Sequence, residues 1–139
     1  MDQDVINSLF AGGGAGTVVE LCQNARLDLT APIQFTAANQ VLQTQGRPSG
    51  NGRATLKLVS TAHTGLIFAF GQGLDYVELR SVILDGNRAE LGQYQGASSA
   101  IIEMGGNTVG QVVSDIYAFD PRGWSCLHLI GTMSTYAAS

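Results

Sequence analysis

The sequence predicts an all-β solenoid in which short parallel strands stack in repeated coils around one core. Runs of β-forming residues follow one another along the chain, and Gly, Asn, Asp and Ser separate them as turn residues. After the first ten residues no helical period of useful length occurs. The segment that begins at Gly71 is also echoed at Gly105, which favours stacked coils over paired hairpins.

The first expected element is a helix over residues 2–10. Its apolar residues recur at helical spacing on one face, and Asp2 or Asp4 can cap its start. The glycine-rich "AGGGAG" that follows is expected to end it. We reject a phosphate-binding loop here, because the Lys-Ser/Thr pair and the strand before it are missing.

Nine β runs follow the helix, and together they predict one domain over residues 1–139. That domain comprises the helix 2–10, β coils over 17–131 and an uncapped tail, 132–139, without strand alternation. Two of the runs break their alternation once, as expected for a strand, a corner and a second strand. The runs span residues 17–22, 27–35, 40–44, 54–60, 65–71, 76–86, 99–105, 111–119 and 125–131.

Two registers align the coils. A shift of 34 residues places Leu79 on Val113 and Leu84 on Ala118. A shift of 25 places Ala100, Ile102 and Met104 over Ser125, Leu127 and Leu129, all pointing inward. The same shift places Ile101 and Glu103 over Cys126 and His128, pointing outward; a shift of 26 would instead bury His128.

Composition limits the classes of partner. The net charge is −4 and Lys57 is the only lysine, so we expect no nucleic-acid partner. The apolar runs are far shorter than a membrane span, so we expect no membrane partner. Cys22 and Cys126 could form one bridge, which their spacing does not decide. We expect no metal and no cofactor.

Several linked segments resemble a group of fungal secreted proteins within the pectin-lyase-like right-handed parallel β-helices. They are residues 9–46, 77–92 and 101–130, including "VELRSVILDGNRAELG" and "QVVSDIYAFDPRGWSCLHLI", and the similarity covers roughly residues 5–130. The resemblance implies a right-handed parallel β-helix with a helical cap and surfaces that face cell-wall or acidic polysaccharide. It also implies secretion, although the start of this chain lacks a signal peptide.

This chain departs from the group in two ways. Members are much longer, so we expect residues 1–139 to be the N-terminal portion of such a protein, with an open end after the last coil. An open end exposes apolar core and unpaired backbone, which predicts a homo-oligomer formed through it. The motifs of the galacturonan hydrolases of this fold (Asn-x-Asp, Asp-Asp, His-Gly and Arg-x-Lys) are also absent.

Glu103 and His128 are the candidate catalytic residues. Matched outward positions on neighbouring strands lie ~4.8 Å apart, within reach of a hydrogen bond between side chains. A carboxylate beside an imidazole can act as an acid/base pair. The alternative is a weakly paired surface couple.

Five residues are candidates for binding substrate: Arg88, Arg122, Asp85, Asp120 and Trp124. Two arginines that repeat at 34 residues could clamp the carboxylates of uronic acids. Alternatively, the aspartates bond the turn backbone and the arginines cover carbonyl groups at a corner. Trp124 would stack on a sugar if exposed, or fill a corner if buried.

The expected function is therefore binding of, or action on, cell-wall or acidic polysaccharide. An enzyme would be a polysaccharide lyase or glycoside hydrolase. The alternatives are a non-catalytic scaffold or fragment that associates through its open end, and a small-molecule enzyme recruited from this fold.

Overall fold

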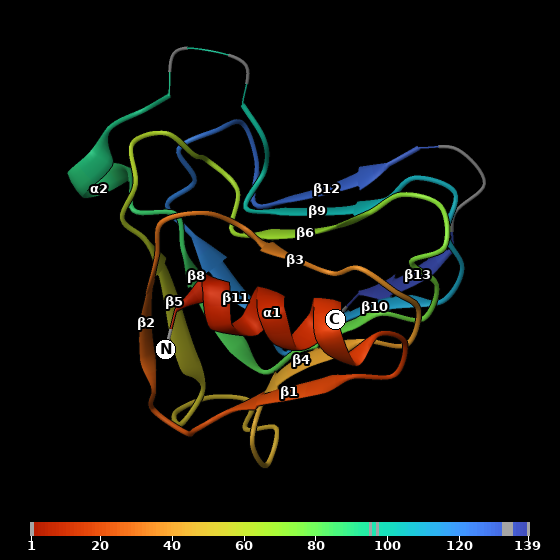
Figure 1. Ribbon diagram of the computed structural model, residues 1–139. Coiled ribbons are helices and arrows are strands. Elements are labelled where there is room, and N and C mark those ends of the chain that lie inside the picture. Colours follow the sequence, from red (N-terminus) through yellow and green to blue (C-terminus); the bar gives the residue numbers. More distant parts are fainter. Residues whose placement is uncertain (1, 95, 97, 132–134, 139) are drawn as a thin grey trace.

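The computed structural model describes residues 2–94, 96, 98–131 and 135–138. In this part of the chain, strands form three parallel sheets, here called A, B and C (Figure 1). Sheet A contains β1 (Val18–Leu21), β4 (Val41–Thr44), β7 (Glu78–Arg80), β10 (Gln111–Ser114) and β13 (Tyr136–Ala138). Sheet B contains β2 (Arg26–Leu29), β5 (Ala54–Leu58), β8 (Val82–Asp85) and β11 (Tyr117–Phe119). Sheet C contains β3 (Ile33–Gln34), β6 (Ile67–Phe70), β9 (Ile102–Gly105) and β12 (Leu127–Ile130).

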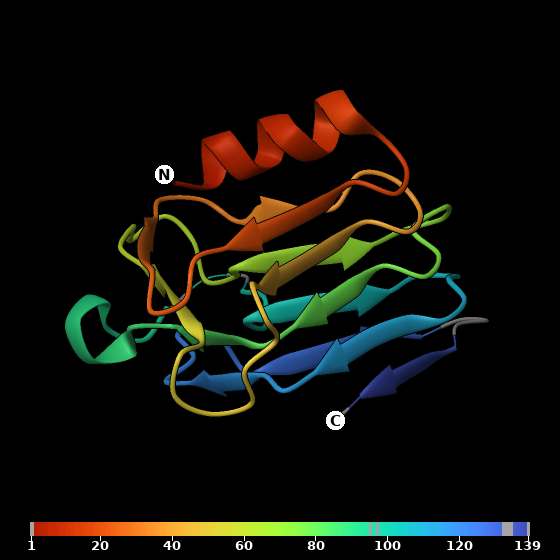
Figure 2. The same ribbon diagram turned by 90° about the horizontal axis from the view of Figure 1, so that it is seen from below.

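The chain passes through sheets A, B and C in turn and then returns to A. Each strand therefore pairs in parallel with the strand three places further along the chain. We call one passage through the three sheets a circuit. The circuits lie in layers, with the helix α1 (Gln3–Gly13) beyond the first layer and β13 at the opposite end (Figure 2). The all-β parallel architecture predicted from the sequence is confirmed.

Both predicted registers are present. Leu79 pairs with Val113 and Leu84 with Ala118, which is the shift of 34. His128 pairs with Glu103, which is the shift of 25 and excludes the shift of 26. Ile101 is an exception to the predicted pattern: it was expected to point outward but is fully buried, because it lies at the corner before β9, where strand alternation has not begun.

The core consists of inward rows that run from circuit to circuit. One row of sheet B contains Leu27, Leu56 and Leu84, and each circuit adds its side chain to the same column. The helix α1 covers the first circuit with Ile6 and Phe10, both fully buried. The Phe10 ring lies 4.8 Å from that of Phe35. The inward side chains of the outermost circuit are only half-buried: Ala118, Leu127 and Leu129.

Asp2 caps α1 as predicted, accepting a hydrogen bond from the Asp4 N–H at 2.9 Å. The helix continues to Gly13, beyond the expected end at residue 10. It ends at Gly14, whose φ of 69° is left-handed and whose N–H donates to the Phe10 carbonyl. The first glycines of "AGGGAG" therefore belong to the helix.

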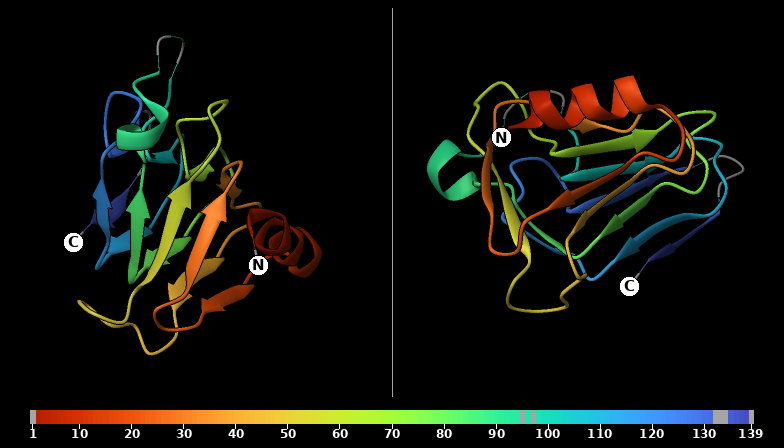
Figure 3. Two further views of the ribbon diagram at one scale, coloured as in Figure 1. Left: turned by 90° about the vertical axis from the view of Figure 1, so that its left-hand side faces the viewer. Right: turned by 60° about the horizontal axis from the view of Figure 1, so that its bottom comes forward.

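Two short elements were not predicted. The helix α2 (Arg88–Leu91) projects beside sheet B, in the connection between β8 and β9 (Figure 3). Strand β13 lies in the tail that was expected to lack strands, and it pairs with β10. Residues 132–134 and 139 of that tail lie outside the described residues.

Two buried glutamines occupy the same register position at the corner between sheets C and A. The Gln40 amide donates to the Phe10 and Gly14 carbonyls and accepts from the Thr36 N–H. Gln111, two circuits later, repeats this role with other partners: it donates to the carbonyls of Ala69 (2.7 Å) and Leu74 (2.9 Å) and accepts from the Gly105 N–H (2.8 Å). Both side chains satisfy backbone groups that the strands leave unpaired.

Candidate functional site

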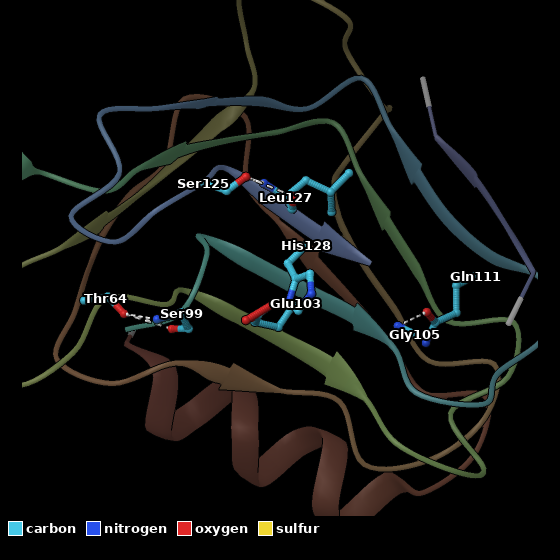
Figure 4. Close-up of polar contacts among 8 residues, drawn as sticks. All are labelled: Thr64, Ser99, Glu103, Gly105, Gln111, Ser125, Leu127 and His128. Atoms are coloured by element: carbon cyan, nitrogen blue, oxygen red, sulfur yellow. Dashed lines mark hydrogen bonds and ion pairs between the residues drawn. The ribbon is translucent and has the colours of Figure 1, made fainter. Parts of the chain in front are cut away.

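The two predicted catalytic residues lie next to each other on the outer face of sheet C. Glu103 on β9 and His128 on β12 are direct strand partners, and Glu103 Oε2 lies 2.7 Å from His128 Nδ1 (Figure 4). The Glu103 side chain is only 10% exposed, whereas the His128 side chain is 37% exposed. The pair thus has an inner carboxyl group and an outer imidazole ring.

Trp124 joins this pair from the connection that precedes β12. Its ring lies edge-on to the His128 ring with the centroids 4.7 Å apart. Trp124 is 59% exposed, so it does not fill a corner of the core. The structure therefore brings three of the seven predicted site residues together on one surface.

Two phenylalanines extend this surface along the neighbouring strand β6. Phe68 is the strand partner of Glu103, and its ring lies 5.5 Å from that of Phe70, which is 44% exposed. Phe68 also borders a hollow of about 250 Å³, whose lining includes the hydroxyl groups of Thr64 and Ser99. These two oxygens lie 2.9 Å apart. The outer face of sheet C thus combines aromatic rings with hydroxyl, imidazole and carboxyl groups.

The Glu103–His128 contact fixes the chemistry available to the imidazole. An ionised carboxylate can only accept hydrogen bonds, so with Glu103 ionised the proton resides on His128 Nδ1. Nε2 of the neutral ring then keeps its lone pair and can accept a hydrogen bond or a proton from a bound molecule. Glu103 would orient the ring.

Arg122 lies elsewhere and is not on the surface. The residue is 4% exposed, and its guanidinium donates to backbone carbonyls of two separate segments, 60–63 and 91–92. These bonds run to Gly92 (2.8 Å), Ser60 (3.2 Å), His63 (2.8 Å) and Leu91 (3.4 Å). The guanidinium also lies 5.5 Å from the centroid of the Tyr94 ring. This placement corresponds to the interpretation in which an arginine covers carbonyl groups.

Arg88, Asp85 and Asp120 lie at the corner that follows sheet B. Asp85 accepts from the Asn87 N–H at 2.8 Å, and Asp120 accepts from the Ala89 N–H at 2.8 Å, as turn aspartates do. The exposed Arg88 forms an ion pair with Asp120 at 3.5 Å. Arg88 and Arg122 therefore do not form an exposed stacked pair.

Neither the two cysteines nor the metal-binding side chains of the described residues form a site. Cys22 and Cys126 are both free, and burial raises the pKa of the Cys126 thiol. Within the described ranges, no three metal-binding side chains of His, Cys, Asp or Glu come together. Among those same residues, no helix has the length and apolar character needed to cross a membrane.

Sequence reasoning missed the two phenylalanines of the surface and the hollow beside them. The alternation of residues 65–71 would place Phe68 and Phe70 outward. Two outward aromatic residues on one strand were the signal that could have indicated a binding surface. The hollow depends on loops that the sequence pattern does not place.

Comparison with models of protein families, with curated proteins and with solved structures found no match to this chain.

Proposed function

We propose that this protein is a right-handed parallel β-helix that binds a cell-wall or acidic polysaccharide on the outer face of sheet C. The order of the sheets supports the fold, because each strand returns to its own sheet after one circuit through the other two. Connections between parallel strands of one sheet are right-handed in almost all proteins.

One observation carries the functional proposal: the exposed Trp124 ring adjoins the His128–Glu103 pair. Sugar rings have apolar faces that stack on aromatic rings and hydroxyl groups that need hydrogen-bond partners. Trp124, Phe68 and Phe70 offer the first kind of contact. His128 and the half-buried Ser99 offer the second within the same surface, and the buried Thr64 hydroxyl bonds Ser99.

A reaction at this site would be proton transfer by His128. Glycoside hydrolases of the usual type need two carboxyl groups on opposite sides of the bond that is cleaved. In the described part of the outer row that runs through Gln34, Phe68, Glu103 and His128, the only carboxyl group is that of Glu103. The site therefore fits better with a lyase, in which a base removes the proton beside a uronate carboxylate, a C=C bond forms, and the bond to the glycosidic oxygen breaks, that oxygen leaving with a proton from water.

Binding is tested with oligogalacturonides of defined length and isothermal titration calorimetry. We expect Trp124→Ala to weaken binding by about tenfold, since an aromatic contact is worth about 1 kcal/mol or more. Tyr117→Ala is the matched control, because Tyr117 is similarly exposed (52%) but lies on sheet B. Equal affinity of the Trp124→Ala variant and the wild type would contradict the proposal.

Catalysis is tested separately with Glu103→Gln, which keeps the shape of the side chain and removes its charge. We expect turnover of polygalacturonate, followed by the absorbance of its unsaturated product, to fall by about a hundredfold while binding persists. Unchanged turnover would show that Glu103 has no part in proton transfer.

A second candidate function is association between two copies through the outermost circuit. Ala118, Leu127 and Leu129 are half-buried there, whereas the inward residues of the earlier circuits are buried. Edge strands also offer unpaired backbone groups to another copy of the same edge. Size exclusion with light scattering should then give twice the 14.6 kDa of one chain, and a stable monomer at high concentration would contradict this.

A further inference from the structure

A second recessed surface lies at the corner between sheets A and B, away from Trp124. It is a groove of about 370 Å³. The loop that connects β4 to β5 forms one wall, and strands β2, β5 and β8 form the floor with Arg26, Thr55 and Ile83, which are aligned in register. Its lining is Asn24, Arg26, Gly50, Asn51, Gly52, Arg53, Thr55 and Ile83.

Two guanidinium groups line the groove and its lining contains no carboxylate, in a protein whose net charge is −4. Carboxylates lie close by, because Arg26 also lines a neighbouring hollow with Asp2 and Asp28. Three other cationic side chains pair with carboxylates: Lys57 with Glu90, Arg80 with Glu78 and Arg88 with Asp120. Asp28, the next outward residue after Arg26 on β2, is the strand partner of Lys57.

The two arginines of the groove differ in how firmly they are held. Arg53 donates from Nε to the Gly50 carbonyl and from Nη1 to the Asp115 carbonyl, both at 3.0 Å. These bonds fix the position of its guanidinium and leave further N–H groups free to bind a ligand. Arg26 is exposed, and within the described residues its side chain has no hydrogen bond or ion pair.

We propose that this groove binds an oxyanion, such as the carboxylate of an acidic sugar, between Arg26 and Arg53. Guanidinium groups bind carboxylates and related oxyanions through paired, charge-assisted hydrogen bonds. The amides of Asn24 and Asn51 and the hydroxyl of Thr55 supply uncharged donors around the anion. The site shares no residue with the surface around Trp124, so it does not depend on the function proposed there.

The test is an NMR titration of the arginine Nε–Hε signals at constant ionic strength. D-galacturonate, inorganic sulfate and uncharged D-galactose are the three probes. We expect galacturonate to shift the Arg26 and Arg53 signals and galactose to leave them unchanged. Sulfate shows which class of anion the groove binds. A shift with both anions indicates a general oxyanion site, and a shift with galacturonate alone indicates a site for sugar acids.

Arg26→Gln should weaken galacturonate binding by about tenfold or more, since charge-assisted bonds are lost. Arg47→Gln is the matched control: Arg47 lies exposed in the same loop, but it bonds Gln43 and does not line the groove. The proposal is overturned if the anions shift all arginine signals alike or if galactose shifts them as galacturonate does. It is also overturned if Arg26→Gln and Arg47→Gln both bind galacturonate as tightly as the wild type does. Circular dichroism of each variant separates loss of binding from loss of fold.

Discussion

Arg88 and Arg122 lie one repeat of 34 residues apart, yet only Arg122 is buried. Its guanidinium donates hydrogen bonds to four backbone carbonyl groups of the 60–63 and 91–92 segments. Arg88 remains on the surface with one ion pair, to Asp120. A repeat in sequence therefore preserves backbone geometry at a corner without preserving the surroundings of the side chain.

This difference predicts unequal effects on stability. Arg122→Met should lower the free energy of unfolding by about 3 kcal/mol, because several buried carbonyls lose their donor. Arg88→Met should change it by less than about 1 kcal/mol, as expected for an exposed ion pair. Urea unfolding of both variants measures the difference. Equal losses would show that Arg122 is not the structural member of the pair.

The pairing of Glu103 with His128 was predictable from the sequence, whereas the burial of Glu103 and the exposure of Trp124 were not. The 25-residue register placed Glu103 beside His128 because both belong to strands with clear alternation. The burial of Glu103 was not predictable, since it depends on neighbours in other circuits and on nearby connections. Whether Trp124 is exposed depends on the path of the 120–126 connection, which contains no periodic pattern.

At the scale of elements, strands β4 and β10 begin at corners where a buried side chain bonds the free backbone groups. Gln40 and Gln111 do this at equivalent positions between sheets C and A. The strands themselves follow from alternation, which is why every predicted β run contains a strand. The four residues of α2 and the three of β13 are too short for any period to indicate them.

The corner glutamines should be important for stability. Gln111→Met keeps a similar volume but leaves the Ala69 and Leu74 carbonyls without a donor, so we expect a loss of about 2–4 kcal/mol. Gln23→Met is the control, because Gln23 is exposed and its single bond is to the Gln45 carbonyl. Thermal unfolding compares them. A loss no greater than that of Gln23→Met would contradict the role assigned to Gln111.

The helix α2 should loosen in acid. A hydrogen bond from Lys57 at 2.9 Å, followed by one from Asn87, holds the pKa of Glu90 below its ordinary value. A lowered carboxyl pKa stabilises the fold above the unfolded pKa, and this contribution is lost as the pH falls through the folded pKa. The protection of the amides within 88–91, corrected for the intrinsic pH dependence of exchange, should therefore fall in acid, and Glu90→Gln should show the same low protection at neutral pH. Unchanged protection in Glu90→Gln would exclude this contact as the cause.

At the scale of the whole molecule, the stacked circuits have one covered end and one partly open end. The helix α1 covers the first circuit, whereas the inward residues of the outermost circuit retain partial exposure. Because each circuit contacts mainly its neighbours, stability should depend on how well the ends are covered. Figure 2 shows α1 lying along the full width of the first layer.

Adjacent residues of α1 provide the comparison. Phe10 is fully buried against Phe35, and Leu9 is 47% exposed. Phe10→Ala should cost about 3–5 kcal/mol as a large core truncation, and Leu9→Ala should cost less than about 1 kcal/mol. Chemical denaturation of both variants gives the two values. Similar small losses would show that α1 does not cover the core.

We propose that the surface around Trp124 binds a polysaccharide, and Trp124 is the only tryptophan in the chain. Its fluorescence therefore reports on this surface without interference from other tryptophans. During titration with oligogalacturonides, we predict a saturable change in intensity and wavelength that grows with oligomer length and disappears in His128→Ala. A spectrum that stays constant up to millimolar concentrations of acidic and neutral oligosaccharides would contradict the claim.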